Sequence, residues 1–530
     1  MTTAGYARYS RFIIRRERVV GLIWLLAMPL AAFGLASLYP GLLPTPESLL
    51  SMASTMNTPA MVAMMGPVYG LDSLTPAIAM SQECLIWFAI ASILMNIFFV
   101  NRHTRVDEEL GRHEMFAALP VGRLAGGASV IVDALVMDVV ITILTALLLI
   151  ALDVGGTTAA GAFAYASSIG AQGFLFAAVT LLTAQLFSTA HGSMGAAFAF
   201  MGISYIMRAS GDVSGGALSL ISPMGLGLKV QAFYANAFWP IAALIAEAVA
   251  VAALALVVNA RRDVGSGVFP ARKGRDSASR FLQSPLGLAW RLSRGTFIAW
   301  AVAFLTLGAM YGAVLGELDS FVEGNDVIRR MLEGQLGAKS LVDAYIPLLG
   351  CVMALIASIP VVNTVNRLRA EERRGRLEQV YARAASRRAM FAGFAAIAAA
   401  EAVVFTFLSA FGLYVSASGT GLVSLGAIMG ASFAYVPAIL TLAAVAAMLV
   451  GIAPRLTALT WALFGYSFIM MYFGRLFDMP TVLPRLSPFS AVPQLPVEAF
   501  RAVPIAVMCG LSALMCGVGL AGYRERDTRY

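Results

Sequence analysis

Long apolar blocks alternate with short polar segments along the whole chain. A membrane-spanning helix needs about 20 mainly apolar residues, and twelve blocks reach roughly that length. They predict spans at 19–39, 80–100, 126–152, 161–187, 190–207, 240–259, 296–316, 343–363, 390–414, 424–451, 454–473 and 502–523. The pattern therefore predicts an all-α, polytopic membrane protein with about 12 transmembrane helices. Tight turns must separate the two closest pairs of spans, near His191 and Pro454.

Composition and charge agree with this prediction. The chain is 59% apolar and 12% charged, with a mean hydropathy of +0.80, so lipid is the solvent that suits it. With the N-terminus inside, 29 of the 37 Lys and Arg residues fall in cytoplasmic segments. Because cytoplasmic loops retain positive charge, we expect a multi-pass protein of the bacterial inner membrane with both termini cytoplasmic. The net charge of +8 is then an orientation signal that requires no nucleic-acid partner.

An internal repeat appears at an offset of 264 residues, just after the second predicted span of each half. Residues 105–114 read RVDEELGRHE and residues 369–378 read RAEERRGRLE. A second match, at offset 265, pairs Ser222-Pro223 with Ser487-Pro488. Since each half has an even number of spans, the halves are predicted to be parallel six-helix repeats. The repeated polar positions are Asp107, Glu108, Gly111, Arg112 and Glu114 in the first loop and Glu371, Glu372, Gly375, Arg376 and Glu378 in the second.

The repeat and the charge pattern suggest three segments. Residues 1–260 form the first six-helix half and residues 284–530 the second. Residues 261–283 are basic and contain several Gly and Ser residues, which indicates a solvated cytoplasmic linker.

The repeated loops, about 102–125 and 366–389, are rich in charges of both signs and in helix-forming residues. We expect short cytoplasmic helices there. Such helices could simply anchor the chain at the membrane surface, or they could bind a cytosolic protein. Acidic residues recur where anchoring alone would favour Lys and Arg, which favours the docking interpretation.

Five ionisable residues fall inside predicted spans. A charge there costs on the order of 2.5–3.5 kcal/mol on insertion scales, so such residues should face the bundle interior or a water-filled path. A packing role and a transport-path role are both open for each of them. They are Glu83, Asp133, Asp138, Glu247 and Glu401.

The second, fifth, eighth and eleventh predicted helices have interior faces that could line a substrate path. Charge is low there, while amide, methionine and aromatic side chains are present, which suits an apolar and variable ligand. The candidate path residues are Asn96, Phe98, Met201, Tyr205, Asn363, Met470 and Tyr472.

Several kinds of chemistry lack their motifs in this sequence. There is no GxxxxGK[ST] phosphate loop, and no polar segment is long enough to fold as an ATPase. The histidines His103, His113 and His191 are scattered without ligand spacing, which argues against a metal site. No nucleophile, base and orienting acid recur at a credible spacing. We therefore expect a non-enzymatic transport subunit that binds no nucleotide or other cofactor itself.

The paired EE..GR.E loops resemble those of permease subunits of bacterial ABC drug and antibiotic exporters, in the polyketide or tetronasin exporter group. Further matching pieces are LAWRLSRG at 288–295, ARRDVGSG at 260–267, YIMRASGD at 205–212 and LSPFSAVPQLP at 486–496. In that group two six-helix halves are fused in one chain, as in an exporter-type ABC transmembrane domain.

The resemblance implies an efflux function driven by ATP. The repeated loops would contact two copies of a separately encoded ATPase subunit, which would hold ATP and Mg. The substrate would be a small amphipathic or hydrophobic compound moved out of the cell. The external Ser-Pro segments would form short helices at the outward exit.

A secondary, ion-coupled multidrug transporter of the major facilitator class is the alternative. It also has six plus six helices and a charged G...DR.GR motif after helices two and eight. The place of the motif's first glycine is taken here by Thr104 and Leu368. The loops also extend further than a tight turn requires, which favours the ABC exporter.

Overall fold

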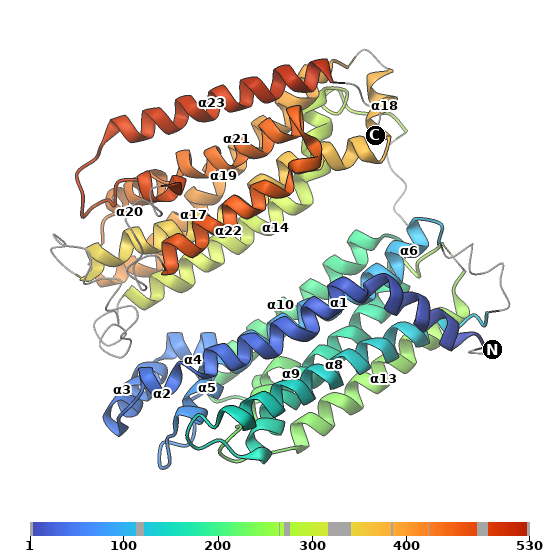
Figure 1. The fold of residues 1–530 in the computed structure, drawn as a ribbon, viewed down its shortest axis with the longest axis vertical. Helices are drawn as coiled ribbons and strands as arrows, with labels where there is room; N and C mark the ends of the chain where they lie inside the picture. Colours follow the sequence, from blue (N-terminus) through green and yellow to red (C-terminus); the bar gives the residue numbers. More distant parts are fainter. Residues whose placement is uncertain are drawn as a thin grey trace. The chain divides into compact units, whose positions relative to one another are not determined.

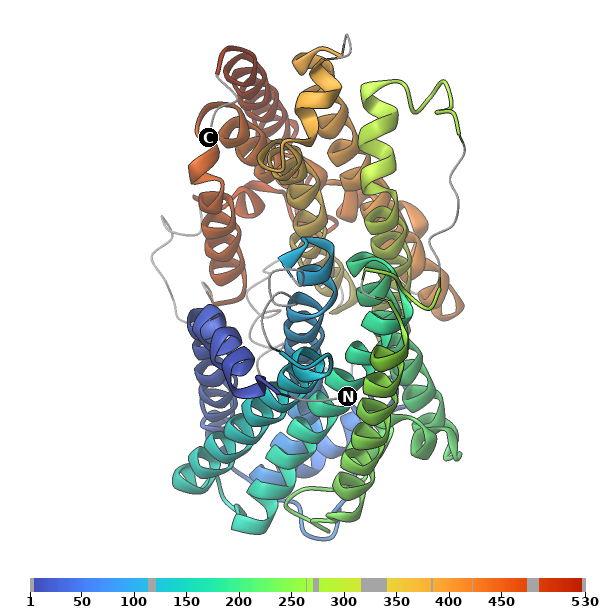
Figure 2. The same ribbon diagram turned by 90° about the vertical axis from the view of Figure 1, so that its right-hand side faces the viewer.

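The computed structural model describes residues 4–112, 121–263, 265–269, 276–315, 341–382, 385–421, 423–473 and 486–526. The chain divides into two compact units, Met1–Lys273 and Gly274–Tyr530. In each unit the long helices run beside one another (Figure 1), and Figure 2 shows the same helices after a quarter turn. The elements of the described residues are helices without a strand, so the all-α prediction is confirmed.

In the first unit, helix α9 lies at the centre. It packs against α5, α8 and α13, while α1 packs along α8. The side chains of α9 are mostly buried because it has neighbours on several sides. The helices are α1 Tyr6–Ala36, α2 Tyr39–Leu42, α3 Pro46–Met56, α4 Pro59–Met65, α5 Pro76–His103, α6 Arg105–Glu109, α8 Ala125–Leu152, α9 Ala159–Leu186, α10 Ala190–Ser214, α11 Leu218–Ile221, α12 Pro223–Leu228 and α13 Trp239–Arg261.

The second unit repeats these neighbours. Helix α14 packs along α19 as α1 does along α8, and α21 contacts α17 and α23 as α9 contacts α5 and α13. An internal repeat of the fold explains this correspondence. The elements are α14 Pro285–Val314, α17 Leu341–Arg373, α18 Arg376–Tyr381, α19 Arg387–Ala417, η2 Ser418–Thr420, α20 Leu425–Phe433, α21 Val436–Ile452, η3 Pro454–Leu456, α22 Ala458–Phe473, η5 Pro488–Ala491 and α23 Ala502–Glu525.

Ten helices of the described residues are long and apolar enough to cross a membrane, which supports a multi-pass membrane protein. The sequence predicted about twelve, so the count differs by two. The predicted spans 190–207 and 454–473 do form helices, α10 and α22. Helix α10 is long enough but not apolar enough by the same measure, and the described part of α22 has only 16 residues.

Local capping explains several boundaries. Thr189 ends the turn after α9, and its hydroxyl accepts a hydrogen bond from Gly192 N at 3.1 Å, which lets α10 begin at once. Ser222 and Ser487 cap α12 and η5 in the same way, accepting from Gly225 N and Phe489 N. The Ser-Pro repeat therefore starts a short helix in each unit. The helices α2, α3 and α4, between the first two spans, were not predicted.

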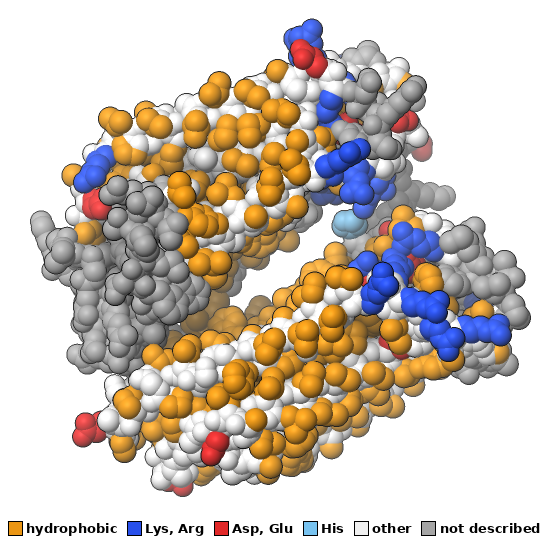
Figure 3. Space-filling view, viewed as in Figure 1, with side chains coloured by type: hydrophobic (Ala, Val, Ile, Leu, Met, Phe, Trp, Pro, Cys, Tyr) orange, Lys and Arg blue, Asp and Glu red, His pale blue; other side chains and the backbone are white. Residues whose placement is uncertain are grey.

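Charge and apolar surface are segregated in both units. Figure 3 shows hydrophobic side chains along the lengths of the helices, while Lys and Arg gather at the ends that carry α6 and α18. Those ends contain the repeated loops.

Candidate functional site

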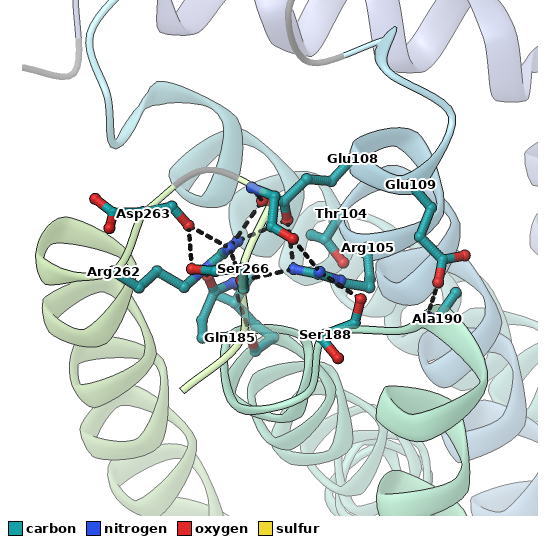
Figure 4. A network of polar contacts seen from close by, with 12 residues as sticks. Thr104, Arg105, Glu108, Glu109, Gln185, Ser188, Ala190, Arg262, Asp263 and Ser266 are labelled. Atoms are coloured by element: carbon teal, nitrogen blue, oxygen red, sulfur yellow. Dashed lines mark hydrogen bonds and ion pairs between the residues drawn. The ribbon is translucent and has the colours of Figure 1, made fainter. Parts of the chain in front are cut away.

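Glu108 on α6 points into the first unit and is held by an arginine 154 residues away (Figure 4). Arg262, just after α13, donates to Glu108 Oε1 at 2.8 Å and to Oε2 at 2.7 Å. Gly265 N also donates to Oε1 at 2.6 Å. Such a two-pronged arginine–carboxylate contact is among the stronger hydrogen-bonded pairs. The two side chains are only 7% and 10% exposed, so solvent weakens the pair little.

Arg105 completes this group from the start of α6. It is 1% exposed and donates to Glu108 Oε2 at 3.0 Å. Its remaining bonds go to the backbone carbonyls of Ser188, Gly265 and Ser266. Arg105 therefore ties α6 both to the turn between α9 and α10 and to the chain after α13. We call Arg105, Glu108 and Arg262 the first cluster.

The chain following α13 is fixed to α9 near this cluster. Arg262 Nε donates to the side-chain oxygen of Gln185 at 2.7 Å. Val268 N donates to the Gln185 carbonyl at 3.2 Å, and Phe269 N donates to the Leu186 carbonyl at 2.8 Å. The first residues of the predicted linker therefore belong to the packed first unit.

The second unit contains the equivalent residues in the equivalent places. Arg526, just after α23, donates to Glu372 Oε2, and Arg369 donates to the hydroxyl of Thr457. We call Arg369, Glu372 and Arg526 the second cluster. Each of its members lies 264 residues after its counterpart in the first cluster. Glu372 and Arg526 are 154 residues apart, like the first pair.

Sequence reasoning missed the two arginines that follow the last helices, although a signal was present. The repeat offset maps Arg262-Asp263 onto Arg526-Asp527. An Arg-Asp pair after the last span of each half could have extended the repeat to these positions.

Aromatic residues close the second cluster. The hydroxyls of Tyr381 on α18 and Tyr523 on α23 lie 2.7 Å apart. The guanidinium carbon of Arg387 is 5.7 Å from the centre of each ring, and that of Arg526 is 4.9 Å from the Tyr523 ring. Burial raises the pKa of Tyr381 above its usual value, so this phenol stays protonated at neutral pH.

The acidic residue before each clustered glutamate is also turned inward. Asp107 is 3% exposed and accepts from Arg16 of α1 at 2.6 Å and from Arg112 at 2.8 Å. Glu371 is 4% exposed and accepts from Arg376 at 3.3 Å. In both units the arginine follows five residues after the acid. This contact closes the loop on itself.

The glycines between acid and arginine allow this closure. Gly111 and Gly375 have φ angles of 70° and 68°, which side chains with a Cβ rarely adopt. Before the glycine, the motif forms the separate helix α6 in the first loop and the end of α17 in the second. After the glycine, α18 begins at Arg376 in the second loop, while the described residues of the first loop end at Arg112, which is helical.

The predicted coupling residues therefore divide into two groups. Asp107, Glu108, Glu371 and Glu372 are fastened inward. Glu378 is exposed and Arg112 and Arg376 are partly or largely exposed, while Glu114 lies outside the described residues. Exposed neighbours outside the set of predicted coupling residues are Glu109, Leu110, Arg373 and Arg374.

The predicted path residues have different surroundings within their own units. Asn96 is buried, whereas Phe98 and Asn363 are exposed on their units. Phe98 contacts Phe198 of α10, with ring centres 5.9 Å apart. On α10, Met201 is half-buried, and Tyr205 donates to the Met64 carbonyl of α4 at 3.0 Å. Met470 is buried; Tyr472 lies on α22, and its side chain is outside the described set.

The ionisable residues inside the spans have different surroundings. Glu83 accepts from the Tyr39 hydroxyl, and Asp133 accepts from Ser10 Oγ at 2.6 Å. Asp138 and Glu401 are buried between helices. The side chain of Glu247 is exposed on the surface of the first unit.

Two comparisons with known proteins agree with each other. Residues 282–524 match the family model described as the C-terminal domain of the multidrug efflux system permease Rv1217c. The chain is also 32% identical over 528 residues to the multidrug efflux system permease protein Rv1217c of Mycobacterium tuberculosis. That alignment covers 98% of this chain and 94% of the relative.

Proposed function

The chain belongs to the multidrug efflux permease family, and on that premise we propose that it is the transmembrane subunit of an ATP-driven exporter. In this proposal it moves amphipathic or hydrophobic compounds out of the cell. Two copies of a separately encoded ATPase bind the α6 and α18 ends and hydrolyse ATP with magnesium. Those ends, and both termini, then face the cytoplasm of a bacterial inner membrane.

The duplication of the cluster is the observation that carries this proposal. Glu108 and Glu372 are bound by arginines at the same sequence separation, each just after the last helix of its unit. Two equivalent surfaces suit two copies of one partner. A single transport pathway driven by two identical ATPase subunits requires two such equivalent surfaces.

The bonds that hold α6 to its neighbours also suit the transmission of movement from a bound partner to the membrane helices. Arg262 links α6 to the end of α13, and Arg105 links it to the turn before α10. A displacement of α6 by a partner would therefore reach at least two membrane helices rather than deform a loose loop. Buried, bidentate ion pairs resist such deformation.

The inward fastening moves the expected contact with the ATPase to the exposed neighbours. Leu110 is 58% exposed beside Glu109, and Arg373, Arg374 and Glu378 are exposed in the second unit. In this proposal Leu110 supplies the apolar centre of the contact and the charged residues beside it supply the polar rim.

Purification of the full chain in mild detergent, followed by identification of co-purifying proteins, tests the proposal. We expect an ATPase subunit at two copies per chain and ATP hydrolysis that drug substrates stimulate. Leu110→Asp should reduce both the recovered ATPase and the drug-stimulated hydrolysis. Leu71→Asp is the matched control, because Leu71 is similarly exposed, at 55%, but precedes α5 instead of following it.

Two outcomes would contradict different parts of the proposal. Equal ATPase recovery with both aspartate variants would remove the contact assigned to Leu110. Efflux by the chain alone in vesicles that contain a proton gradient and no ATP would replace the ATP-driven mechanism with the ion-coupled alternative.

A further inference from the structure

Two buried carboxyl groups occupy matching positions in the two units. Asp138 is the fourteenth residue of α8 and Glu401 the fifteenth of α19. At 1.5 Å per residue both lie about 20 Å from the start of their helix. These helices pack in the same way within their units, α8 along α1 and α19 along α14.

Asp138 is 2% exposed and has only neutral partners. Asn96 Nδ2 donates to its Oδ1 at 2.9 Å, and Ser92 Oγ donates to the same atom at 3.4 Å. Its Oδ2 has no hydrogen-bond partner, and neither does Asn96 Oδ1. The group thus has more acceptors than donors, and one added proton would reduce the difference.

Helix α9 packs against the group that Asp138 of α8 forms with Ser92 and Asn96 of α5. A Cβ at Gly173 would lie 2.1 Å from Ser92 Oγ and 2.9 Å from Asp138 Oδ1, so the α9 backbone passes directly against both. The sequence of α9 contains no charged residue. The charged groups of α5 are Glu83, Arg102 and His103. Arg102 is the nearer of these along the helix, six residues from Asn96, or about 9 Å.

Glu401 is 0% exposed and has a similar arrangement. Thr364 Oγ1 on α17 donates to its Oε1 at 2.9 Å, and its Oε2 has no hydrogen-bond partner. Arg367 of α17 is the charged group that acts on it, but the two form no ion pair among the described contacts. The neighbouring α20 and α21 carry no charged residue.

An ionised carboxylate without a cation in contact is strongly disfavoured in such surroundings, because burial removes its hydration and nothing replaces it. We propose that Asp138 and Glu401 are a pair of intramembrane proton-binding sites, one in each half, each holding a proton as a neutral carboxylic acid. This goes beyond the efflux function and does not depend on ATP. The proton comes from water and returns to water, and no other bond changes.

Each site lies between the second and third long helices of its half. If these helices separate and admit water, hydration stabilises the carboxylate and the proton leaves. If they close again, the carboxyl must recover a proton before it is buried. Closure of each half thus takes up one proton, and opening releases one.

Infrared spectroscopy of the full chain in lipid tests the sites independently of transport. A protonated carboxyl has a C=O stretching band that an ionised one lacks. At neutral pH we expect this band in the unmodified protein and a partial loss in Asp138→Asn and in Glu401→Gln. The double variant should lose both parts. Asp72→Asn is the control that keeps the band, because Asp72 is exposed between α4 and α5.

Thermal unfolding provides the second measurement. Asn and Gln have nearly the shape of the neutral acids, so melting temperatures should stay close to that of the unmodified chain. An unchanged band in both variants would overturn the proposal. So would variants that fail to fold, because a required negative charge would then be what the amides removed.

Discussion

Replacing Arg262 by methionine removes the guanidinium from the first cluster while keeping a long side chain. Removing one member of a buried ion pair costs about 3–5 kcal/mol. Here Glu108 keeps Arg105 at 3.0 Å and Gly265 N at 2.6 Å, so its charge is not left alone. We therefore expect the free energy of unfolding to fall by about 1.5–3 kcal/mol, the range for a lost hydrogen bond to a charged group.

A double-mutant cycle separates the contact from the general effect of each change. The cycle combines Arg262→Met with Glu108→Gln and measures reversible denaturant unfolding in detergent. Residues in direct contact typically have interaction energies of 0.5–3 kcal/mol, and the two short hydrogen bonds at 2.7 and 2.8 Å place this pair at about 1.5–3 kcal/mol in that range.

Pairing Arg262→Met with Glu47→Gln is the control cycle. Glu47 is exposed on α3, so its effect should simply add to that of Arg262→Met. If the interaction energy in the Glu108 cycle is no larger than in this control, the ion pair between Arg262 and Glu108 does not hold the loop. The same cycle with Glu372→Gln and Arg526→Met should give a positive coupling in the second unit.

Three further substitutions probe close packing, backbone strain and a buried charge. Gly173→Ala should cost about 1–3 kcal/mol, because the added Cβ would lie 2.1 Å from Ser92 Oγ. Gly375→Ala should cost about 1–2 kcal/mol from left-handed backbone strain, because its φ is 68°. No atom lies within 4 Å of the added Cβ, so steric overlap contributes nothing. Arg208→Met should cost about 3–5 kcal/mol, because its buried guanidinium holds two carbonyls of α4 and faces Asp212 at 3.6 Å. Denaturant unfolding measures all three, and hydrogen exchange of α4 should also rise in the Arg208 variant.

The matched control for the glycine substitutions is Gly510→Ala in α23. No atom lies within 4 Å of a Cβ at this position, and alanine is the better helix former. A gain of up to about 1 kcal/mol is expected. Losses of equal size at Gly510 and Gly173 would show that the close contact at Gly173 is not the cause.

The span pattern was predictable because apolar blocks of helical length have few alternatives in lipid. One of the two spans that were not counted lies where this signal weakens, whereas α22 is apolar and only 16 of its residues are described. Helix α10 contains His191, Arg208 and Asp212. These polar residues lower its mean hydropathy below that of the ten counted spans. The turn before α10 was predicted from the spacing of the two apolar blocks, without the capping hydroxyl of Thr189 that the structure shows.

The direction of the charged side chains could not be predicted. A polar loop with alternating charges is usually solvated, and the sequence pattern of Glu108 does not distinguish an exposed glutamate from a fastened one. Its partner Arg262 is 154 residues away, a separation at which only the fold decides contact. The repeat did not point to Leu110, because Arg374 takes its place in the second loop.

Fixing the chain after α13 also determines where the polypeptide could be divided. Residues up to Phe269 belong to the first unit through backbone bonds to α9. A gene split after Phe269 would leave the first product with both Arg262 and the carbonyls that Arg105 binds. A split before Arg262 would give the second product an arginine that the first one needs. The two fragments of the first split should therefore be stable enough to be expressed separately, whereas the first fragment of the second should be degraded.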